Sequence, residues 1–317
     1  MLKQTFVAHV KFEILLDRWE TRTTQLISSV RRRLTSLTSS DTRPPHGSFQ
    51  NSWQIHMSLP LDFQIDRLTP TRRPAQPVAG YQVWTNLLFA HWRVPAADVQ
   101  ALLPPELTVD TWDGSAWLGV VPFYMSWIRP WWSPAVPGVS WFCETNLRTY
   151  VHRRGEQPGV WFFSLEASKS LAVRAARWGW HLPYHRATMS LERQGNKVRY
   201  ASHRLWPGTA GACCNAEIEV GPLLGEGEAG RELSPGQAIP GTFEHWLVER
   251  YILFAAPGPG KLVTGRVYHT PYPVRSARIL TLEQSLTDAI GLTMPGPPEH
   301  VAFSDGVQVE VFQLRAV

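Results

Sequence analysis

The chain has 317 residues, of which 44% are hydrophobic and 18% are charged, enough to build a substantial core and too apolar for a wholly disordered protein. The formal net charge is +5, but residues 1–80 hold 11 Lys and Arg against 6 Asp and Glu, whereas residues 81–317 hold 20 of each kind. The excess charge therefore belongs to the first quarter of the chain. The neutral remainder offers no broad basic surface, which argues against a nucleic-acid partner.

Residues 1–80 are predicted to be a basic, disordered N-terminal extension, because prolines recur from Pro44 to Pro77 and little periodicity surrounds them. A targeting peptide and an extension ahead of a natural start at Met57 are the alternatives. No apolar run reaches the roughly 18 residues of a membrane helix, and acidic residues interrupt the N-terminal segment. We therefore expect a cytoplasmic protein without a membrane partner, with a single domain over residues 81–317.

From Tyr81 onward the sequence alternates short strands with turns, and Asp113-Gly114 and residues 194–196 are typical of hairpin turns. A short helix is predicted after Pro95, a second over 169–178 capped by Ser168, a third from Thr242 to about 251, and a fourth over 285–290. Strands are predicted over 81–94, 107–112, 116–122, 144–152, 160–166, 184–193, 197–206, 216–220, 262–269, 277–282 and 307–314. This pattern predicts a mainly β fold, an antiparallel barrel or sandwich with short decorating helices.

Two patterns resemble cofactor or metal motifs, and neither has the surroundings that such a motif needs. Gly225–Gly230 matches the spacing of a dinucleotide loop, but no strand–helix–strand unit surrounds it and its glutamates would repel a pyrophosphate. His181 and His185 have helical spacing, but Pro183 lies between them. We expect no cofactor and no metal.

The segment from Glu144 to Val151 alternates in character. In a strand, Glu144, Asn146, Arg148 and Tyr150 share one face. Such a row is either a solvent-facing surface or the polar lining of a cavity that holds a small ligand. An aromatic strand follows, and nine tryptophans lie between Trp112 and Trp180. With these neighbours, the cavity-lining interpretation and the solvent-facing interpretation are equally well supported.

Lys169 is the only lysine between residues 12 and 196, and it stands where a strand meets a helix. Apolar neighbours and a helix N-terminus both lower the pKa of a lysine and make its amine a nucleophile for carbonyl substrates. The alternative is an ordinary exposed lysine at a helix start, which the sequence alone favours.

Six segments are recognisable in order and spacing: HWRVP (91–95), LLPPELTVDTWDGSAWLGVVPF (102–123), ETNLRTYV (144–151), GVWFFSLEA (159–167), LPYHRA (182–187) and ERYILF (249–254). With these segments the chain resembles the YqjF-like family of uncharacterised proteins (domain of unknown function 2071), in the acetoacetate decarboxylase-like superfamily. The resemblance spans about Asn86 to Leu314.

This resemblance implies a barrel-like fold with an interior cavity. It also implies the site of the superfamily's decarboxylases, in which a lysine in a Lys-Lys-Leu-Ala-like motif forms a Schiff base. Lys169-Ser170-Leu171-Ala172 matches that motif with Lys169 as the nucleophile, and Glu144 stands where the decarboxylases carry an acidic residue. Ser170 replaces the second lysine, which removes one cause of a lowered lysine pKa.

The leading hypothesis is a cavity protein that binds a small organic acid or carbonyl compound. Arg148, Asn146 and Tyr150 would bind the ligand, with Arg148 holding a carboxylate. As an enzyme it would be an acetoacetate decarboxylase-like carbon–carbon lyase, with Lys169 and Glu144 as catalytic residues. The alternatives are a non-catalytic binding or protein-interaction module that uses surface residues such as Trp127, Trp131-Trp132 and Pro134, and tryptophans that only fill the core. Homo-oligomerisation is left open.

Overall fold

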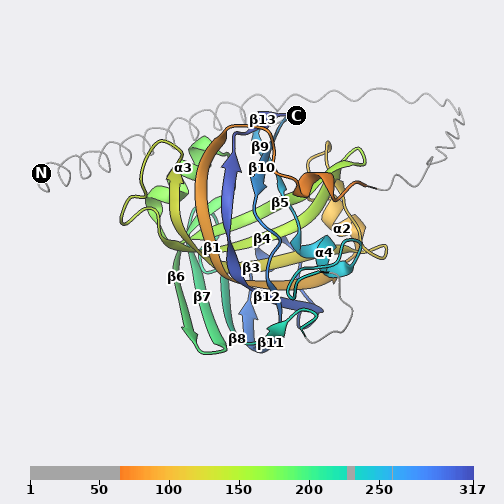
Figure 1. Cartoon of the computed structure of the whole chain (residues 1–317), viewed down its shortest axis with the longest axis vertical. Coiled ribbons are helices and arrows are strands. Elements are labelled where there is room, and N and C mark those ends of the chain that lie inside the picture. Colours follow the sequence, from red (N-terminus) through yellow and green to blue (C-terminus); the bar gives the residue numbers. More distant parts are fainter. Residues whose placement is uncertain (1–64, 227–232, 259) are drawn as a thin grey trace, which may run out of the picture. The chain divides into compact units, whose positions relative to one another are not determined.

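Residues 65–226, 233–258 and 260–317 are described by a computed structural model of the chain (Figure 1), and they belong to one compact unit. The helices are α2 (Ala96–Gln100), α3 (Ser170–Gly179) and α4 (Phe243–Val248), with 3₁₀ turns η1 (Thr69–Thr71) and η2 (Asp288–Ile290). The strands are β1 (Val78–Val94), β2 (Thr108–Val109), β3 (Ala116–Pro130), β4 (Phe142–Arg153), β5 (Glu156–Ala167), β6 (Tyr184–Gln194), β7 (Lys197–Trp206), β8 (Cys213–Leu223), β9 (Ile252–Gly258), β10 (Lys261–Tyr268), β11 (Val274–Gln284), β12 (His300–Phe312) and β13 (Arg315–Ala316).

The described strands form one thirteen-stranded sheet, in the order β13-β10-β9-β5-β6-β7-β8-β11-β12-β1-β3-β4-β2. Two further pairings, β10 with β12 and β5 with β4, close this sheet on itself. The mainly β fold of the prediction is confirmed. The closure is a ring of strands, in which β5 runs parallel to β6 and to β9 while the other pairs run antiparallel.

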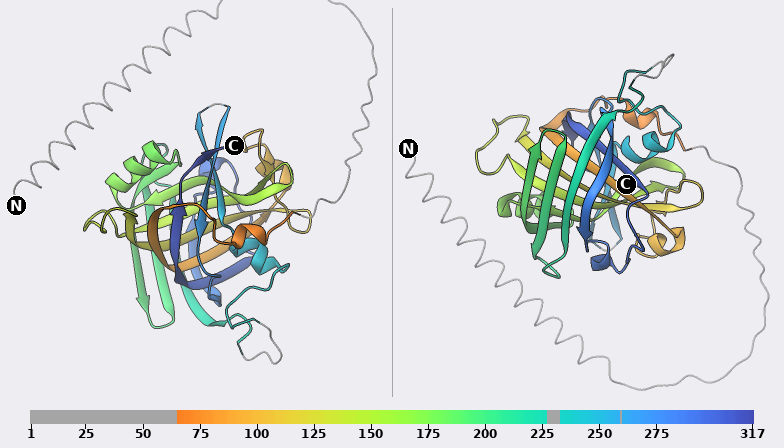
Figure 2. Two further views of the ribbon diagram at one scale, coloured as in Figure 1. Left: turned by 45° about the horizontal axis from the view of Figure 1, so that its top comes forward. Right: turned by 90° about the horizontal axis from the view of Figure 1, so that it is seen from below.

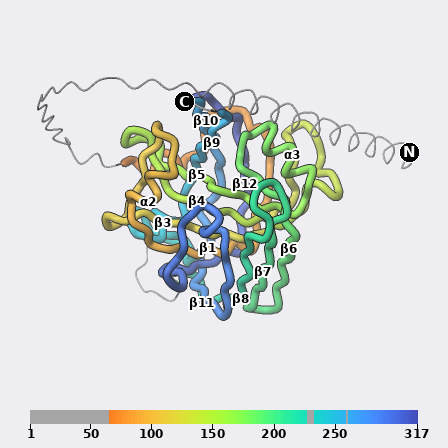
Figure 3. The backbone as a smooth tube through the Cα atoms, turned by 180° about the vertical axis from the view of Figure 1, so that it is seen from behind, coloured from red at the N-terminus to blue at the C-terminus, as the bar shows by residue number. Residues whose placement is uncertain are grey.

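The two closures have five strands in common, β12, β1, β3, β4 and β5. These five strands form a wall between the two parts of the ring. Strands β6, β7, β8 and β11 lie side by side on one side of this wall, and β9 and β10 complete the ring on the other (Figures 1 and 2). Seen from behind, helices α2 and α3 lie on opposite flanks of the strands (Figure 3).

The wall carries apolar side chains on both faces. Along β1, Leu87 and Phe89 belong to one buried cluster, and Leu88 and Ala90 belong to another. Successive side chains of a strand point to opposite faces, so a continuous apolar run such as Leu87–Ala90 is what a strand buried on both sides requires.

Several local predictions are confirmed and others need correction. Thr242 caps α4 by accepting a hydrogen bond from the His245 N–H, as predicted. Asp113 and Gly114 turn the chain with φ values of 50° and 70°. Ser168 does not cap α3: its hydroxyl accepts from the Cys143 N–H, and Lys169 stands at the cap position without a side-chain cap bond. Strand β9 was not predicted.

Residues 1–64 lie outside the described residues, and the extension predicted there stays a prediction. Its last part is described, and it contacts the sheet through Arg67, which pairs with Asp110, and Arg73, which pairs with Glu310. The Gly225–Gly230 motif also extends outside the described residues. Among the described residues, none of the helices combines the length and apolar character that a membrane span requires.

Candidate functional site

The polar face of β4 is buried. Glu144, Asn146 and Arg148 are 3%, 7% and 9% exposed, and Tyr150 is fully buried. Strand β4 lies between β3 and β5, so both of its edges are hydrogen-bonded. Successive side chains of β4 therefore project from opposite faces of the wall. Of the two readings of this row, the structure therefore excludes the solvent-facing one.

Glu144, Asn146 and Arg148 line a cavity of about 460 Å³. The cavity lies on the face of the wall that β9 and β10 complete, and α3 contributes to its lining. Tyr150 is not among the lining residues and packs on Trp246 with ring centroids 4.7 Å apart. The residues that line the cavity are mostly apolar, with Arg250, Tyr184, Tyr251, Tyr272 and Gln82 as further polar members.

Arg148 has no carboxylate partner among the described residues. Its Nη2 lies 3.5 Å from the Tyr150 hydroxyl and 3.5 Å from the Leu247 carbonyl, the long limit of a hydrogen bond. Its Nε has no hydrogen-bond partner in the described part of the chain, and the guanidinium lies over the rings of Phe89 and Tyr150. A buried cation with so few partners leaves hydrogen-bonding capacity for an anion in the cavity.

A second buried guanidinium adds to this positive charge. Arg250 donates from Nη1 to Asp110 at 2.8 Å and from Nε to the Trp246 carbonyl at 2.7 Å. Its Nη2 has no partner among the residues that the structure describes. Asp110 also accepts from Arg67 at 2.6 Å. One carboxylate thus pairs with two arginines. Together with Arg148, positive charges outnumber negative charges at this end of the cavity.

Glu144 lies at the other end of the same row. Burial raises its pKa to about 8, the charge of Glu166 adds to the rise, and a hydrogen bond from the Tyr184 hydroxyl at 2.8 Å opposes it. No cation pairs with Glu144 among the described residues. The side chain is therefore protonated at neutral pH, which makes it a proton donor facing the cavity.

A chain of hydrogen bonds links Tyr150, His91 and His300. The Tyr150 hydroxyl lies 2.7 Å from His91 Nε2, and His91 Nδ1 lies 2.9 Å from His300 Nδ1. Burial lowers the pKa of His91 well below its ordinary value, so the ring is neutral. Gly119 makes room for it, since a Cβ there would lie 2.9 Å from the imidazole. The chain fixes the position of the Tyr150 hydroxyl beside Arg148.

Lys169 is half-buried at the N-terminus of α3, and no lysine is among the described residues that line the cavity. Burial raises the pKa of the Cys143 thiol and the charge of Lys169 opposes that rise, so the two residues are neighbours. Cys143 precedes Glu144 and points to the other face of β4. The structure thus brings Glu144, Asn146 and Arg148 together and leaves Lys169 apart from them.

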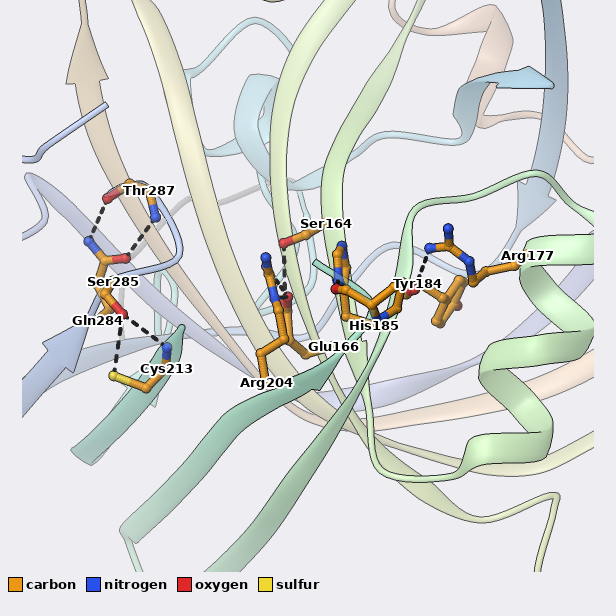
Figure 4. Close-up of polar contacts among 11 residues, drawn as sticks. Ser164, Glu166, Arg177, Tyr184, His185, Arg204, Cys213, Gln284, Ser285 and Thr287 are labelled. Carbon is orange, nitrogen blue, oxygen red and sulfur yellow. Dashed lines mark hydrogen bonds and ion pairs between the residues drawn. The ribbon is translucent and has the colours of Figure 1, made fainter. Parts of the chain in front are cut away.

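Glu166 and Arg204 lie on the face of the wall away from the cavity, where they form a buried ion pair (Figure 4). Arg204 donates from Nε to Glu166 at 3.0 Å, and the Ser164 hydroxyl donates to the same carboxylate at 3.3 Å. Figure 4 also shows Arg177 of α3 donating to the Tyr184 carbonyl, a contact that ties α3 to β6.

Sequence reasoning missed His91, Tyr184 and Arg250. Each of them stands in a segment that carries the family resemblance: HWRVP, LPYHRA and ERYILF. No spacing rule links these segments to β4, because they are distant in sequence and meet only when the ring of strands closes. The resemblance was therefore the one available signal, and it identified the segments without assigning roles to their residues.

Known proteins share this fold. Acetoacetate decarboxylase from Legionella pneumophila superposes with a TM-score of 0.51 at 12% identity, over 86% of this chain and 98% of that chain. The enduracididine biosynthesis enzyme MppR in complex with pyruvate gives a TM-score of 0.50 at 12% identity, over 78% of this chain and 92% of that chain. The acetoacetate decarboxylase-like fold is thereby shown.

Relationship by sequence is closer to proteins without an assigned activity. The uncharacterized protein YqjF of Bacillus subtilis (strain 168) is 37% identical over 234 residues, which cover 74% of this chain and 90% of that protein. Residues 81–308 match the family model DUF2071, described as an uncharacterized conserved protein. The chain therefore belongs to the DUF2071 family.

Proposed function

We propose that the cavity binds a small organic acid, whose carboxylate Arg148 holds. The observation that carries this proposal is the buried Arg148 guanidinium without a carboxylate partner among the described residues. A buried charge is costly unless it is paired. A ligand carboxylate would supply the missing counter-ion, and a guanidinium offers it two parallel N–H donors.

The neighbours of Arg148 support an anionic ligand. Arg250 brings a second guanidinium with a free N–H, and Asp110 is already shared between Arg250 and Arg67. Asn146 has a carbonyl oxygen without a partner in the described part of the chain, an acceptor for a hydroxyl or other donor on the ligand and not for its carboxylate. The pyruvate named for the MppR complex is an acid of the proposed class, bound by a protein of the same fold.

The protonated Glu144 supports a proton-transfer role toward the bound acid. In a decarboxylation of a β-keto acid, the bond between the carboxyl carbon and the α-carbon breaks and its electrons form an enolate. A neutral carboxylic acid then protonates the α-carbon, and carbon dioxide leaves. Glu144 can supply that proton where the carboxyl group that leaves lies at its own end of the cavity, away from the carboxylate that Arg148 holds, and Tyr184 orients the Glu144 carboxyl group. This lyase chemistry is the enzymatic form of the proposal.

Binding of pyruvate tests the role of Arg148. We expect Arg148→Gln to weaken pyruvate binding about 10- to 100-fold, because a charge-assisted hydrogen bond contributes about 1.5–3 kcal/mol. Ligand-detected NMR titration measures the dissociation constants. Arg199→Gln, which removes an exposed arginine of β7, serves as the control and should bind like the wild type. Equal affinity of the Arg148 variant and the wild type would overturn the proposal.

Imine formation at Lys169 has a separate test. Because Lys169 is not among the cavity-lining residues, we expect borohydride reduction in the presence of acetoacetate to leave the protein mass unchanged. Mass spectrometry of the wild type and of Lys169→Ala provides the measurement. A wild-type adduct that disappears in Lys169→Ala would contradict this expectation and establish the Schiff-base mechanism.

One observation favours a second candidate function, a protein-interaction module. Trp127, near the end of β3, and Trp131 and Trp132, on the connection to β4, are 59%, 64% and 71% exposed. Large exposed aromatic side chains are enriched at interfaces. None of these three tryptophans is among the residues that line the cavity.

A further inference from the structure

We propose that the ligand is an amphipathic carboxylic acid, with a hydrocarbon body longer than the carbon chain of pyruvate. This inference rests on the proposed function and names the class of acid that the site takes. It follows from three properties of the cavity: the composition of its walls, the separation of its polar groups, and the nature of its mouth.

Apart from β4, most of the elements around the cavity line it with apolar side chains. Trp84 comes from β1, Phe123 from β3, Phe162 from β5, Val267 from β10 and Ala176 from α3. A pocket of about 460 Å³ falls within the range of pockets that enclose drug-sized molecules, roughly 300–1,000 Å³. A three-carbon acid held at Arg148 would leave most of this apolar surface uncovered.

The two functional groups of β4 are far apart. Glu144 and Arg148 are four residues apart on one face of the strand, which places their Cα atoms about 13 Å from each other at 3.3 Å per residue. Asn146, whose Oδ1 has no partner within the described ranges, lies between them. A ligand that contacts Arg148 with its carboxylate and reaches Glu144 with another part therefore needs an extended body.

An apolar surface runs from solvent into the cavity. Trp178 of α3 is 83% exposed and also lines the cavity, so it stands at the mouth. Ile128, near the end of β3, and Val139, in the connection between β3 and β4, line the same cavity. That connection lies beside α3 in two views (Figures 1 and 2). An apolar entrance fits a ligand with a hydrocarbon body and offers little to a small, fully hydrated acid.

A series of straight-chain acids from propanoate to decanoate tests the inference on the full chain, with the matching primary alcohols measured in parallel. We expect affinity for the acids to rise about three- to fourfold with each methylene until the cavity is filled. Each acid should bind more tightly than the alcohol of the same length. Arg148→Gln should remove the difference between acid and alcohol and keep the dependence on length.

The outcomes separate the inference from the proposed function. Affinity that does not rise with length, while Arg148→Gln still weakens acid binding, overturns the inference and leaves the proposed function in place. Affinity that rises with length, while acids and alcohols bind equally in the wild type, overturns the proposed function.

Variants that fill the cavity supply an independent measurement. Ala176→Leu and Ala176→Phe place larger side chains on the face of α3 that lines the cavity. We expect them to lower the affinity for octanoate and decanoate at least tenfold and to leave propanoate binding unchanged, which also shows that the variants are folded. Unchanged decanoate binding in a folded Ala176→Phe variant would contradict the inference.

Discussion

Replacing Arg204 by methionine is expected to lower the free energy of unfolding by about 3–5 kcal/mol, because it leaves the Glu166 carboxylate buried without its cation. Glu166 has no exposure to solvent, and its other partner is the Ser164 hydroxyl at 3.3 Å. Neither water nor a second cation among the described residues can replace the guanidinium. Urea-induced unfolding at pH 8 measures the loss.

Removing both charges has a different expected effect. The double variant Glu166→Leu/Arg204→Met should lose less than about 1 kcal/mol, because apolar side chains of similar volume replace a buried ion pair at little cost. Arg199→Met, on the same strand as Arg204 but paired at the surface with Glu217, should leave stability nearly unchanged. A double variant as unstable as Arg204→Met alone would mean that packing, and not the unpaired carboxylate, determines the loss.

The sequence predicted most strands because their apolar patterns are local. The hairpin turns at Asp113-Gly114 and Gly195 need positive φ values, and residues that accept them are visible in the sequence. Strand β9 was missed because its residues, Ile252–Gly258, include Pro257 and lack alternation. Its parallel pairing with β5 depends on a contact between segments far apart in the chain, which no local pattern encodes.

The candidate site also combines residues that a local pattern predicts with residues that only the fold brings together. Glu144, Asn146 and Arg148 were found together because the two-residue period of one strand places them on one face. Arg250 was missed because it follows α4 and reaches the cavity only through the fold. Lys169 was predicted from its motif and its position before a helix, but neither feature specifies whether the side chain reaches the cavity, and Lys169 is not among the described residues that line it.

Glu144 should make the protein less stable as the pH rises. Its pKa is about 8 in the folded protein, against an ordinary value of 4.5, so between these pH values the folded state holds a proton that the unfolded state has released. Rising pH therefore favours the unfolded state. The expected loss is up to about 1.4 kcal/mol per pH unit, or on the order of 4–5 kcal/mol across the window, and it is complete above pH 8.

The variant Glu144→Gln isolates this contribution, because glutamine has a similar shape, can accept the hydrogen bond from Tyr184 and does not titrate. We expect wild type and variant to have similar free energies of unfolding near pH 4.5, and the variant to be more stable by about 4 kcal/mol at pH 9. Other buried carboxyls such as Glu249 affect both proteins alike. Glu217→Gln, at a half-buried position on β8, should follow the wild-type profile. Parallel profiles for wild type and Glu144→Gln would show that Glu144 is ionised in the folded protein, and would remove it as the proton donor of the proposed reaction.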